Sequence, residues 1–247
     1  MAYYKIADLL VEMDTFGRTA AQAEAYRTEA TGQPDISIYL DPEELKNDTL
    51  LFAREEQEYM YTGSLFCREL LQFDGMYLHA SAVVKDGYAF LFSAPSGTGK
   101  STHTQLWLKH FGEGQAQILN DDKPALRYID GVWYAYGTPW SGKTDLNLNM
   151  RVPLGGIAVL ERGQENKIRP LTGPQAVYAL MSQTMRGGSA EMRSLMMERL
   201  DRLLTDVPVW QLSCTPEVEA AQVAYEAMYP AAKEMTEKSE KEKNNEN

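Results

Sequence analysis

The stretch Ala94-Pro-Ser-Gly-Thr-Gly-Lys-Ser-Thr102 decides how the chain around it folds. It follows an apolar run of β-forming residues, Tyr88-Ala-Phe-Leu-Phe-Ser93, and it precedes bulky side chains at helical spacing up to Phe111. The sequence therefore predicts a strand, a glycine-rich loop and a helix in direct succession. A Gly/Ala-x-x-x-x-Gly-Lys-Ser loop in this context is typical of phosphate binding.

The glycine-rich loop contains the residue types that a phosphate site needs. The glycines let backbone N–H groups point at phosphate oxygens, Lys100 reaches the terminal phosphates, and the Ser101 hydroxyl can ligate Mg²⁺. The positive end of the following helix adds to the attraction for anions. The alternative interpretation is a glycine-rich turn with an incidental lysine. The nucleotide-binding residues that we expect here are Ser96, Gly97, Thr98, Gly99, Lys100, Ser101 and Thr102.

Two adjacent acids, Asp121 and Asp122, follow the next short strand, Gln117-Ile-Leu-Asn120. A strand-helix-strand crossover returns the chain to the edge of the sheet from which the loop emerged, so these acids would face the bound phosphates. One carboxylate can then hold Mg²⁺, and the other can accept a proton from an attacking hydroxyl. Without the loop, a solvated turn would be the simpler interpretation of this pair.

A hairpin is predicted directly before the loop. Two apolar runs, residues 77–84 and 88–93, are joined through Lys85-Asp86-Gly87, and Asp-Gly between two strands is a strong hairpin signal. Such an antiparallel neighbour is unexpected in the mostly parallel sheets of ordinary P-loop enzymes. The fold class that we expect is therefore α/β with a mixed, partly antiparallel sheet.

These motifs together resemble the catalytic core of the HPr serine kinase/phosphorylase group, which is related to the phosphoenolpyruvate carboxykinases. The resemblance implies a phosphoenolpyruvate carboxykinase-like P-loop core with an antiparallel hairpin before the Walker A loop. It also implies ATP and Mg²⁺ as cofactors and a serine hydroxyl as the phosphoryl acceptor. The segments that carry it are Leu78-His79-Ala-Ser-Ala82, Asp86-Gly87, Ser96-Gly-Thr-Gly-Lys-Ser-Thr102 and Leu119-Asn-Asp-Asp122.

The resemblance also implies roles for single residues. Asp121 would be the general base for the serine hydroxyl, with Lys100 cradling the phosphates, and Asp122 would hold the metal together with Ser101. His79 would lie close to the reacting phosphate, although a hydrogen-bonded core histidine on a strand is the alternative. Thr102 stands where the HPr kinases have an acidic residue, which is closer to the carboxykinase form.

Other candidate residues lie outside these motifs. The loop Gly137-Thr-Pro-Trp-Ser-Gly-Lys143 places a cation at the expected active edge, so Lys143 is either a second phosphate ligand or an ordinary surface lysine. Arg151 and Arg186 could neutralise charge on a transferred phosphoryl group, but nothing positions them, so we expect surface arginines. His103, on the helix after the loop, has no carboxylate pair near it, so we expect no metal site there.

Composition narrows the class of protein. The chain has 247 residues, of which 44% are hydrophobic and 24% charged, as in ordinary globular proteins. No run approaches the roughly 18 apolar residues of a membrane span, and Asp8 interrupts the first apolar stretch where an export signal would be apolar. The net charge of −11 gives no basic footprint for nucleic acid. We therefore expect a cytoplasmic protein with no membrane or nucleic-acid partner.

Three regions are predicted along the chain. Residues 1–72 form a small N-terminal α/β region without a chemical motif, residues 73–230 form the nucleotide-binding core, and residues 231–247 form a charged tail. The tail contains almost no apolar side chains, so we expect it to be disordered. Within the N-terminal region the expected elements are strands over 3–13 and 36–40, helices near 19–26 and 55–72, and a helix cap at 41–44.

Two functions fit this sequence. The first is an ATP- and Mg²⁺-dependent kinase that transfers the terminal phosphoryl group to a hydroxyl, with a serine of a protein or peptide as the expected acceptor. The second is a regulatory or peptide-binding module that binds a nucleotide without transferring phosphate. A carboxykinase acting on a small carboxylate would need a cluster of cationic and metal-binding groups, and the sequence shows no clear set. Members of the HPr kinase group often form oligomers, so a homo-oligomer is also an expectation of the resemblance.

Overall fold

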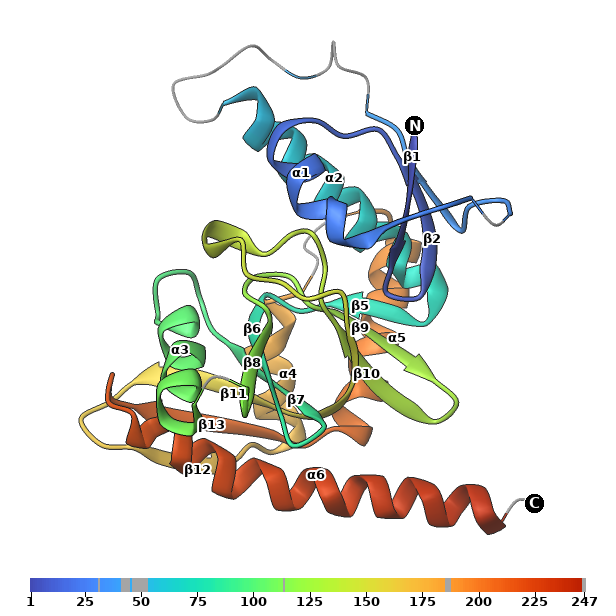
Figure 1. The fold of residues 1–247 in the computed structure, drawn as a ribbon. Coiled ribbons are helices and arrows are strands. Elements are labelled where there is room, and N and C mark those ends of the chain that lie inside the picture. The colour runs from blue at the N-terminus through green and yellow to red at the C-terminus, as the bar shows by residue number, and fades with distance from the viewer. Residues whose placement is uncertain (31, 41–44, 46–52, 113, 185–187, 246–247) are drawn as a thin grey trace.

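The chain folds around two β-sheets, as the computed structural model shows (Figure 1). The structure describes residues 1–30, 32–40, 45, 53–112, 114–184 and 188–245. The smaller sheet has four strands in the order β3-β1-β2-β4, and the larger sheet has nine strands. Parallel and antiparallel pairs occur in both sheets, and helices pack against them. The prediction of a mixed α/β fold is therefore confirmed.

The first two strands correct the expected strand over residues 3–13. β1 (Ala2–Ile6) and β2 (Leu9–Met13) form an antiparallel hairpin in which Ile6 faces Leu9. The turn between them consists of Ala7 and Asp8, with φ angles of 53° and 62°. Two successive positive φ angles define the type I′ turn, which usually contains Asn or Gly. Because Ala-Asp lacks that signal and apolar residues continue on both sides, the sequence suggests one unbroken strand.

The rest of the N-terminal region consists of short strands and two helices. β3 pairs with β1 antiparallel, and β4 pairs with β2 parallel. The predicted long helix is present as α2, and the cap expected at 41–44 lies outside the described residues. The elements are β3 (Arg27–Thr28), β4 (Ile36–Ile38), α1 (Gly17–Ala23), α2 (Arg54–Glu69) and two 3₁₀ helices, Glu24–Tyr26 and Leu70–Phe73.

The larger sheet contains the predicted hairpin. Its strands are β5 (Gly75–Tyr77), β6 (Ala80–Lys85), β7 (Tyr88–Ser93), β8 (Ala116–Asn120), β9 (Ala125–Ile129), β10 (Val132–Tyr136), β11 (Arg151–Arg162), β12 (Lys167–Pro170) and β13 (Val209–Cys214). β6 and β7 pair antiparallel and turn at Asp86 and Gly87, which both have positive φ angles. β8 pairs antiparallel with the other edge of β6. β7 and β8 therefore run in the same direction, and their C-terminal ends meet at one edge of the sheet.

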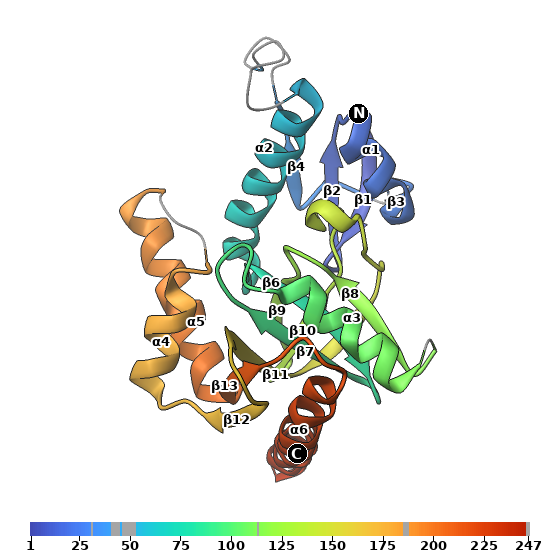
Figure 2. The same ribbon diagram turned by 90° about the vertical axis from the view of Figure 1, so that its left-hand side faces the viewer.

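The long strand β11 organises the rest of the larger sheet. Its first residues pair with β10 antiparallel, and its later residues pair with β7 on one side and β13 on the other, both parallel. The main path of the sheet is β5-β9-β10-β11-β7-β6-β8, and β12 extends it beyond β13. Only Leu78 and His79 separate β5 from β6, although these strands lie far apart in this order. The sheet is therefore curled (Figure 2).

Four helices cover the larger sheet: α3 (Lys100–Phe111), α4 (Gly173–Met181), α5 (Ala190–Asp206) and α6 (Glu219–Asn245). One hydrophobic cluster joins the sheet to α4 and α5, and another joins it to α3 and α6. A third cluster contains residues of the N-terminal sheet, of α2 and of β9, β10 and the loop after β10. The N-terminal region is therefore packed directly on the core.

The C-terminal segment differs from the predicted disordered tail over 231–247, because α6 continues to Asn245. After Pro230 this segment is rich in Glu and Lys and has no glycine, and these residues favour a helix even where little is buried. Thr236 accepts a hydrogen bond from the Tyr88 hydroxyl at 3.1 Å, and Met235 packs against the core. The charged composition that suggested disorder thus also suits an exposed helix.

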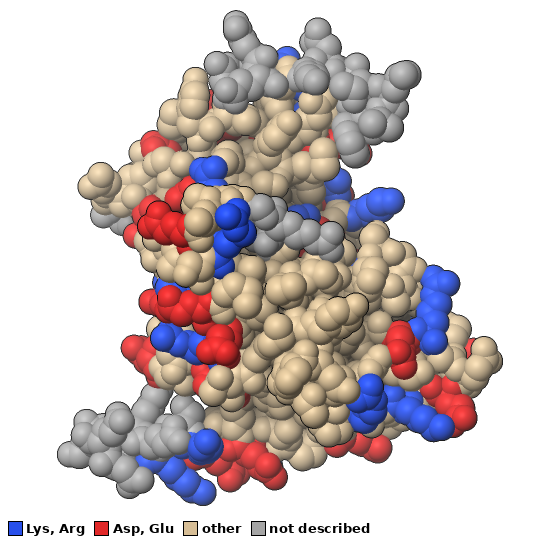
Figure 3. Space-filling view, turned by 180° about the vertical axis from the view of Figure 1, so that it is seen from behind, with Lys and Arg blue, Asp and Glu red and all other residues tan. Residues whose placement is uncertain are grey.

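On the face seen from behind, lysines and arginines lie beside aspartates and glutamates around a broad uncharged centre (Figure 3). Within the described part of the chain, no helix is both long and apolar enough to span a lipid bilayer.

The contact between α2 and the loop after β10 generates a stability prediction. Gly63 lies in the middle of α2, and a Cβ added there would lie 2.8 Å from Cδ1 of Trp140. The Trp140 ring is 1% exposed, stacks on Phe66 with centroids 4.9 Å apart, and donates a hydrogen bond to Thr62 Oγ1 at 3.1 Å. Trp140 therefore has little freedom to move away.

We expect Gly63→Val to lower the free energy of unfolding by about 1 to 3 kcal/mol, the usual cost of overpacking a filled core. Urea denaturation measures this change. Gly173→Val is the matched control, because Gly173 also lies in a helix and a Cβ there meets no atom within 4 Å. Equal stability of the two variants would show that the close packing of Trp140 does not exclude a larger side chain at position 63.

Candidate active site

Residues 94–99 form the loop between the end of β7 and the start of α3. Gly97 and Gly99 have φ angles of 80° and 126°, which residues with a side chain rarely adopt. A Cβ at either position would meet no atom within 4 Å. The backbone conformation, rather than a lack of space, therefore requires glycine at both positions.

Lys100 is the first residue of α3, and its side chain folds back over the loop. Its Nζ donates a hydrogen bond to the Ala94 carbonyl at 2.9 Å, and the residue is only 8% exposed. Burial lowers the pKa of Lys100, while the carboxylates of Asp122 and Asp121 act in the opposite direction. The loop thus holds a buried ammonium group within the electric field of both acids.

Arg162, at the end of β11, holds the glycine-rich loop in place by binding two of the loop's backbone carbonyl groups. Its guanidinium donates to the Gly97 carbonyl at 2.6 Å and to the Thr98 carbonyl at 3.2 Å. The Thr98 N–H donates to the Pro95 carbonyl at 3.3 Å, whereas the described part of the chain provides no acceptor for the N–H groups of Gly97 and residues 99–102. The first N–H groups of a helix have no partner within that helix. These amides are therefore available to an anion.

The turn that carries the two acids is fixed by Asn120, the last residue of β8. The Asn120 side-chain oxygen accepts hydrogen bonds from the N–H groups of Asp122, at 3.1 Å, and Lys123, at 2.8 Å. Its amide group donates to the Thr138 carbonyl at 2.8 Å. Asn120 is completely buried, so the turn is held from inside the protein.

Asp121 is buried and accepts two hydroxyl hydrogen bonds. Ser81 donates to Oδ1 in a short contact, and Thr144 donates to Oδ2 at 2.8 Å. Because the single Ser81 proton goes to Asp121, Thr104 donates to the Ser81 hydroxyl at 2.8 Å and shares the same proton with the Ser101 carbonyl at 3.1 Å. A chain of hydroxyl groups therefore connects Asp121 to the turn of α3 that contains Ser101.

Asp122 lies between two groups that can carry positive charge. His79 Nε2 is 3.4 Å from Oδ1, and Lys123 Nζ contacts Oδ2 closely. Burial alone would raise the pKa of Asp122, but the hydrogen bond with His79 and the charge of Lys123 outweigh burial and lower the pKa to about 2. The other ring nitrogen of His79, Nδ1, is 2.9 Å from Gln183 Oε1, which orients the ring.

These groups meet in a cavity of about 540 Å³. Of the site residues expected from the sequence, only Thr98 is absent from its lining, and Thr98 lines a neighbouring cavity instead. Arg18, Glu56, Tyr59, Met60, Gly142 and Thr144 complete the wall. The expected residues that line it are His79, Ser96, Gly97, Gly99, Lys100, Ser101, Thr102, Asp121, Asp122 and Lys143.

The N-terminal region positions the wall that contains Lys143. Gly142 donates its N–H to the Tyr59 hydroxyl at 3.0 Å. Arg18 pairs with Asp145 at 2.6 Å, donates to the Gly142 carbonyl, and lies over the Tyr59 ring at 4.3 Å from its centroid. α1 and α2 therefore hold the 3₁₀ turn Gly142–Thr144 at the wall of this cavity.

Several residues of this site carry no motif in the sequence. Arg18 and Tyr59 come from the region without chemical motifs, and only tertiary packing brings them to the cavity. Ser81 offers a weak signal, because it is a hydroxyl between two alanines in an otherwise apolar strand. Arg151 pairs with Asp8 at 3.0 Å and does not line the cavity. Arg186 lies outside the described residues.

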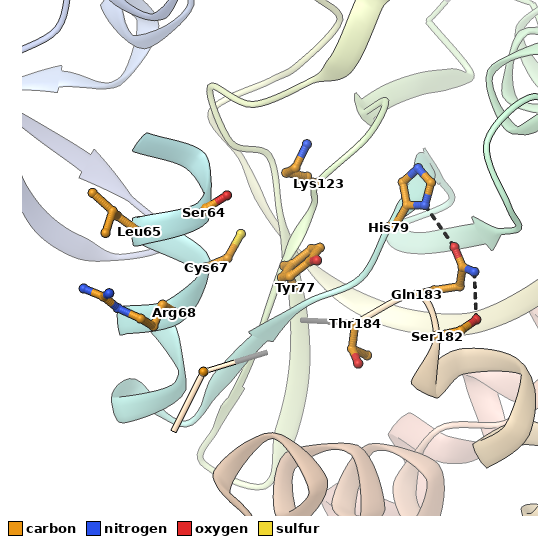
Figure 4. Close-up of a pocket in the computed structure, with 11 residues that line it drawn as sticks. Ser64, Leu65, Cys67, Arg68, Tyr77, His79, Lys123, Ser182, Gln183 and Thr184 are labelled. Atoms are coloured by element: carbon orange, nitrogen blue, oxygen red, sulfur yellow. Dashed lines mark hydrogen bonds between the residues drawn. The ribbon is translucent and has the colours of Figure 1, made fainter. Parts of the chain in front are cut away.

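A second cavity, of about 560 Å³, lies on the other side of His79. α2 contributes one wall, and the segment after α4, which contains Gln183, contributes the opposite wall (Figure 4). Lys123 lies between these walls. Cys67 also lines the cavity, and burial raises the pKa of its thiol to about 12, so it remains a neutral thiol. His79 is the residue that lines both cavities.

Comparison with known proteins gives the family. Residues 57–219 match the sequence profile of SynChlorMet cassette protein ScmC, and the chain belongs to this family. Among solved structures, the HPr(Ser) kinase/phosphatase from Coxiella burnetii is 11% identical, with a TM-score of 0.38 over 62% of this chain and 95% of that chain. These values indicate only a distant similarity of fold. No curated protein matches the chain.

The contact between α1 and α2 includes a carboxyl group with an altered pKa. Thr19, next to Arg18, donates a short hydrogen bond to Glu58, next to Tyr59, and both residues are buried. Burial raises the pKa of Glu58 to about 7, although the hydrogen bond from Thr19 acts in the opposite direction. The folded protein therefore keeps a proton that the unfolded chain releases near pH 4.5.

We expect the stability of the protein to fall relative to that of Glu58→Gln as the pH rises from 4.5 to about 7. The difference amounts to up to about 3 kcal/mol, because one pKa unit corresponds to about 1.4 kcal/mol. The glutamine keeps an acceptor for Thr19 but has no proton to lose. Urea denaturation of both proteins across this pH range measures the effect. Parallel pH profiles would contradict it.

Proposed function

We propose that this protein is a kinase that uses ATP and Mg²⁺ to phosphorylate a serine hydroxyl of a protein or peptide. One observation carries this proposal: a glycine-rich loop with available amides, a buried lysine and two carboxylates line the same cavity. Phosphoryl transfer needs little covalent chemistry from the protein and depends on positioning and on neutralising charge. The groups around this cavity supply both.

In this proposal the nucleotide phosphates bind at residues 97–101. The amides at the start of α3 donate hydrogen bonds to the phosphate oxygens, and Lys100 neutralises their charge. Arg162 keeps the loop open for this purpose by binding its carbonyl groups. The hairpin β6-β7 before the loop supports a phosphoenolpyruvate carboxykinase-like core rather than an ordinary P-loop fold.

The oxygen donors at the cavity fit Mg²⁺. Mg²⁺ prefers oxygen ligands and is often bound by one or two carboxylates together with substrate phosphates. Among the described residues, no group of three or more His, Cys, Asp or Glu side chains could hold a metal alone, so the ion would enter with the nucleotide. Ser101 and one of the two acids would hold it. When bound, it supplies neutralisation of charge on the phosphate oxygens.

The geometry favours roles for Asp121 and Asp122 that are the reverse of those implied by the resemblance to the HPr kinases. Asp121 is connected through Ser81 and Thr104 to the turn with Ser101, so we assign Asp121 to the metal. Asp122 contacts His79, which borders the second cavity. We therefore assign Asp122 to the acceptor hydroxyl, which it would orient and from which it would take the proton.

The second cavity is then the entrance for the acceptor. It reaches His79 from the side of α2, while the phosphate loop lies on the side of the first cavity. A serine side chain in the second cavity would approach Asp122 past the His79 ring. His79 would keep its orientation through Gln183 and would support the carboxylate during proton transfer.

One observation favours a second function, a binding module without phosphoryl transfer. Lys123 contacts one oxygen of Asp122, and the charge of Asp122 raises the pKa of Lys123 against the effect of burial. If this ion pair persists with a nucleotide bound, Asp122 is less available to an acceptor. Nucleotide binding would then continue without transfer, and measurements of binding and turnover on the same variants separate the two functions.

We expect Lys100→Ala to lower phosphoryl transfer at least about a hundredfold, as the loss of a preorganised charge at a reacting group does. The measurement is labelling of a library of serine-containing peptides and proteins by γ-labelled ATP and Mg²⁺. Lys109→Ala is the control, because Lys109 lies at the exposed end of the same helix. Labelling that survives Lys100→Ala would rule out this mechanism.

Asp121→Asn and Asp122→Asn are expected to differ. Asp121→Asn should remove most of the effect of Mg²⁺ on ATP affinity, measured by calorimetry with and without the ion. Asp122→Asn should leave ATP affinity within about twofold and lower turnover about a hundredfold or more. The opposite pattern would restore the roles implied by the resemblance. ATP binding without measurable turnover in the unchanged protein would favour the binding module.

A further inference from the structure

A third cavity, of about 380 Å³, adjoins the phosphate loop. It lies between α3 and the C-terminal ends of β11 and β13. Gly99 and Thr102 line both this cavity and the candidate active site, and Thr98 lines this one alone of the two. The two cavities are therefore neighbours across the start of α3, and one extended ligand can occupy both.

The walls of this cavity suit a flat apolar ring. Leu106, Leu160 and Pro216 supply apolar surface, and Thr215 adds a hydroxyl at the rim. The segment with Thr215 is fixed, because Asn166 accepts hydrogen bonds from its N–H at 2.8 Å and its hydroxyl at 3.2 Å. Cavities of roughly 300 Å³ or more with apolar walls and a few polar groups are typical of small-molecule sites.

His103 supplies a polar group without a partner in this wall. It is 2% exposed, and its ring lies against Phe92 with centroids 4.3 Å apart. Nε2 accepts a hydrogen bond from Trp107 Nε1 at 3.2 Å. Because Nε2 accepts this hydrogen bond, the proton of the ring is on Nδ1.

The Nδ1–H of His103 has no acceptor among the described residues and no contact with bulk water. Buried donors in folded proteins nearly always have an acceptor, and the exceptions need an explanation. Histidine cannot remove this mismatch by changing tautomer, because Trp107 requires Nε2 as an acceptor. An incoming ligand with an acceptor atom would satisfy it.

We propose that this cavity binds the purine base of the nucleotide whose phosphates lie on residues 97–101, and that His103 donates its Nδ1 proton to an acceptor on the base. This inference rests on the proposed function, because it takes the phosphates as given. A purine has a flat apolar face for Leu106 and Leu160, and its ring nitrogens are acceptors at its edge. With the base in this cavity and the phosphates on the loop, the sugar would lie between them.

The test compares two ligands and two variants of His103. ATP contains a base, whereas inorganic triphosphate has only the phosphates. His103→Gln places its amide near the position of Nε2, so it keeps an acceptor for Trp107 and removes the donor at Nδ1. His103→Asn places its amide near Nδ1 and keeps that donor. Thermal unfolding of each variant establishes that it is folded.

We expect His103→Gln to lower ATP affinity about tenfold, the effect of losing one buried hydrogen bond to a ligand, with triphosphate affinity unchanged within twofold. His103→Asn should retain more of the ATP affinity. Pro216→Trp, at an exposed position on the rim, should fill the cavity and lower the affinity for ATP to that for triphosphate. This last variant leaves His103 and its packing intact, so it tests the site even if the His103 variants unfold.

The outcomes separate the two proposals. If ATP and triphosphate bind with equal affinity to the unchanged protein, or if Pro216→Trp leaves ATP affinity unchanged, the base site is overturned and the phosphate site stands. If neither ligand binds the unchanged protein, the proposed function fails and the base site fails with it. A specific loss of ATP affinity in His103→Gln and Pro216→Trp supports the base site.

Discussion

The hydroxyl of Ser81 joins the elements on which the candidate site depends. It lies on β6, contacts Asp121 after β8, and reaches Thr104 on α3. A buried carboxylate is costly unless hydrogen bonds compensate for lost hydration, and Ser81 with Thr144 provides two such bonds. Because β6 separates β7 from β8, one side chain on β6 can set the distance between the glycine-rich loop and the acids. The order of strands in the sheet thus helps to determine the geometry of the candidate site.

The N-terminal region imposes the second constraint. The loop after β10 has no regular secondary structure except a short 3₁₀ turn, so its position depends on what packs against it. Trp140 fixes one end of this loop on α2, and Arg18 and Tyr59 fix the turn next to Lys143. A region without any chemical motif thereby completes the wall of the cavity. The N-terminal region positions the loop after β10, so substitutions in this region would alter the candidate site by moving that loop.

The sequence predicts the parts of this site that depend on local structure. The strand, the glycine-rich loop and the helix follow each other along the chain, and the requirement for positive φ angles identifies Gly97 and Gly99. The meeting of Asp121 and Asp122 with the loop also follows from the direction of the strands. Arg18, Ser81 and Thr144 could not be predicted in this way, because each reaches the site only through contacts between segments far apart in the sequence.

Two expectations are wrong for local reasons. The strand expected over 3–13 is a hairpin, because Ala7 and Asp8 adopt a turn that their identities do not require. The tail expected to be disordered is a helix, because helix propensity and surface charge are compatible. The roles of Asp121 and Asp122 stay a prediction, because adjacent positions in the sequence do not distinguish the carboxylate that would hold the metal from the one that would meet the acceptor.

The three cavities adjoin one another through shared lining residues, and this order has a consequence for the proposed reaction. The cavity with His103 meets the loop at Thr98 and Gly99, the carboxylates lie beyond Ser101, and the second cavity begins at His79. Under the proposed function, a nucleotide with its base against His103 would direct its terminal phosphate toward Asp121 and Asp122. An acceptor entering past His79 would approach that phosphate from the second cavity, and in-line transfer requires that the attacking and leaving oxygens lie on opposite sides. The position of the base would therefore set the direction of transfer, although the base would take no part in the chemistry.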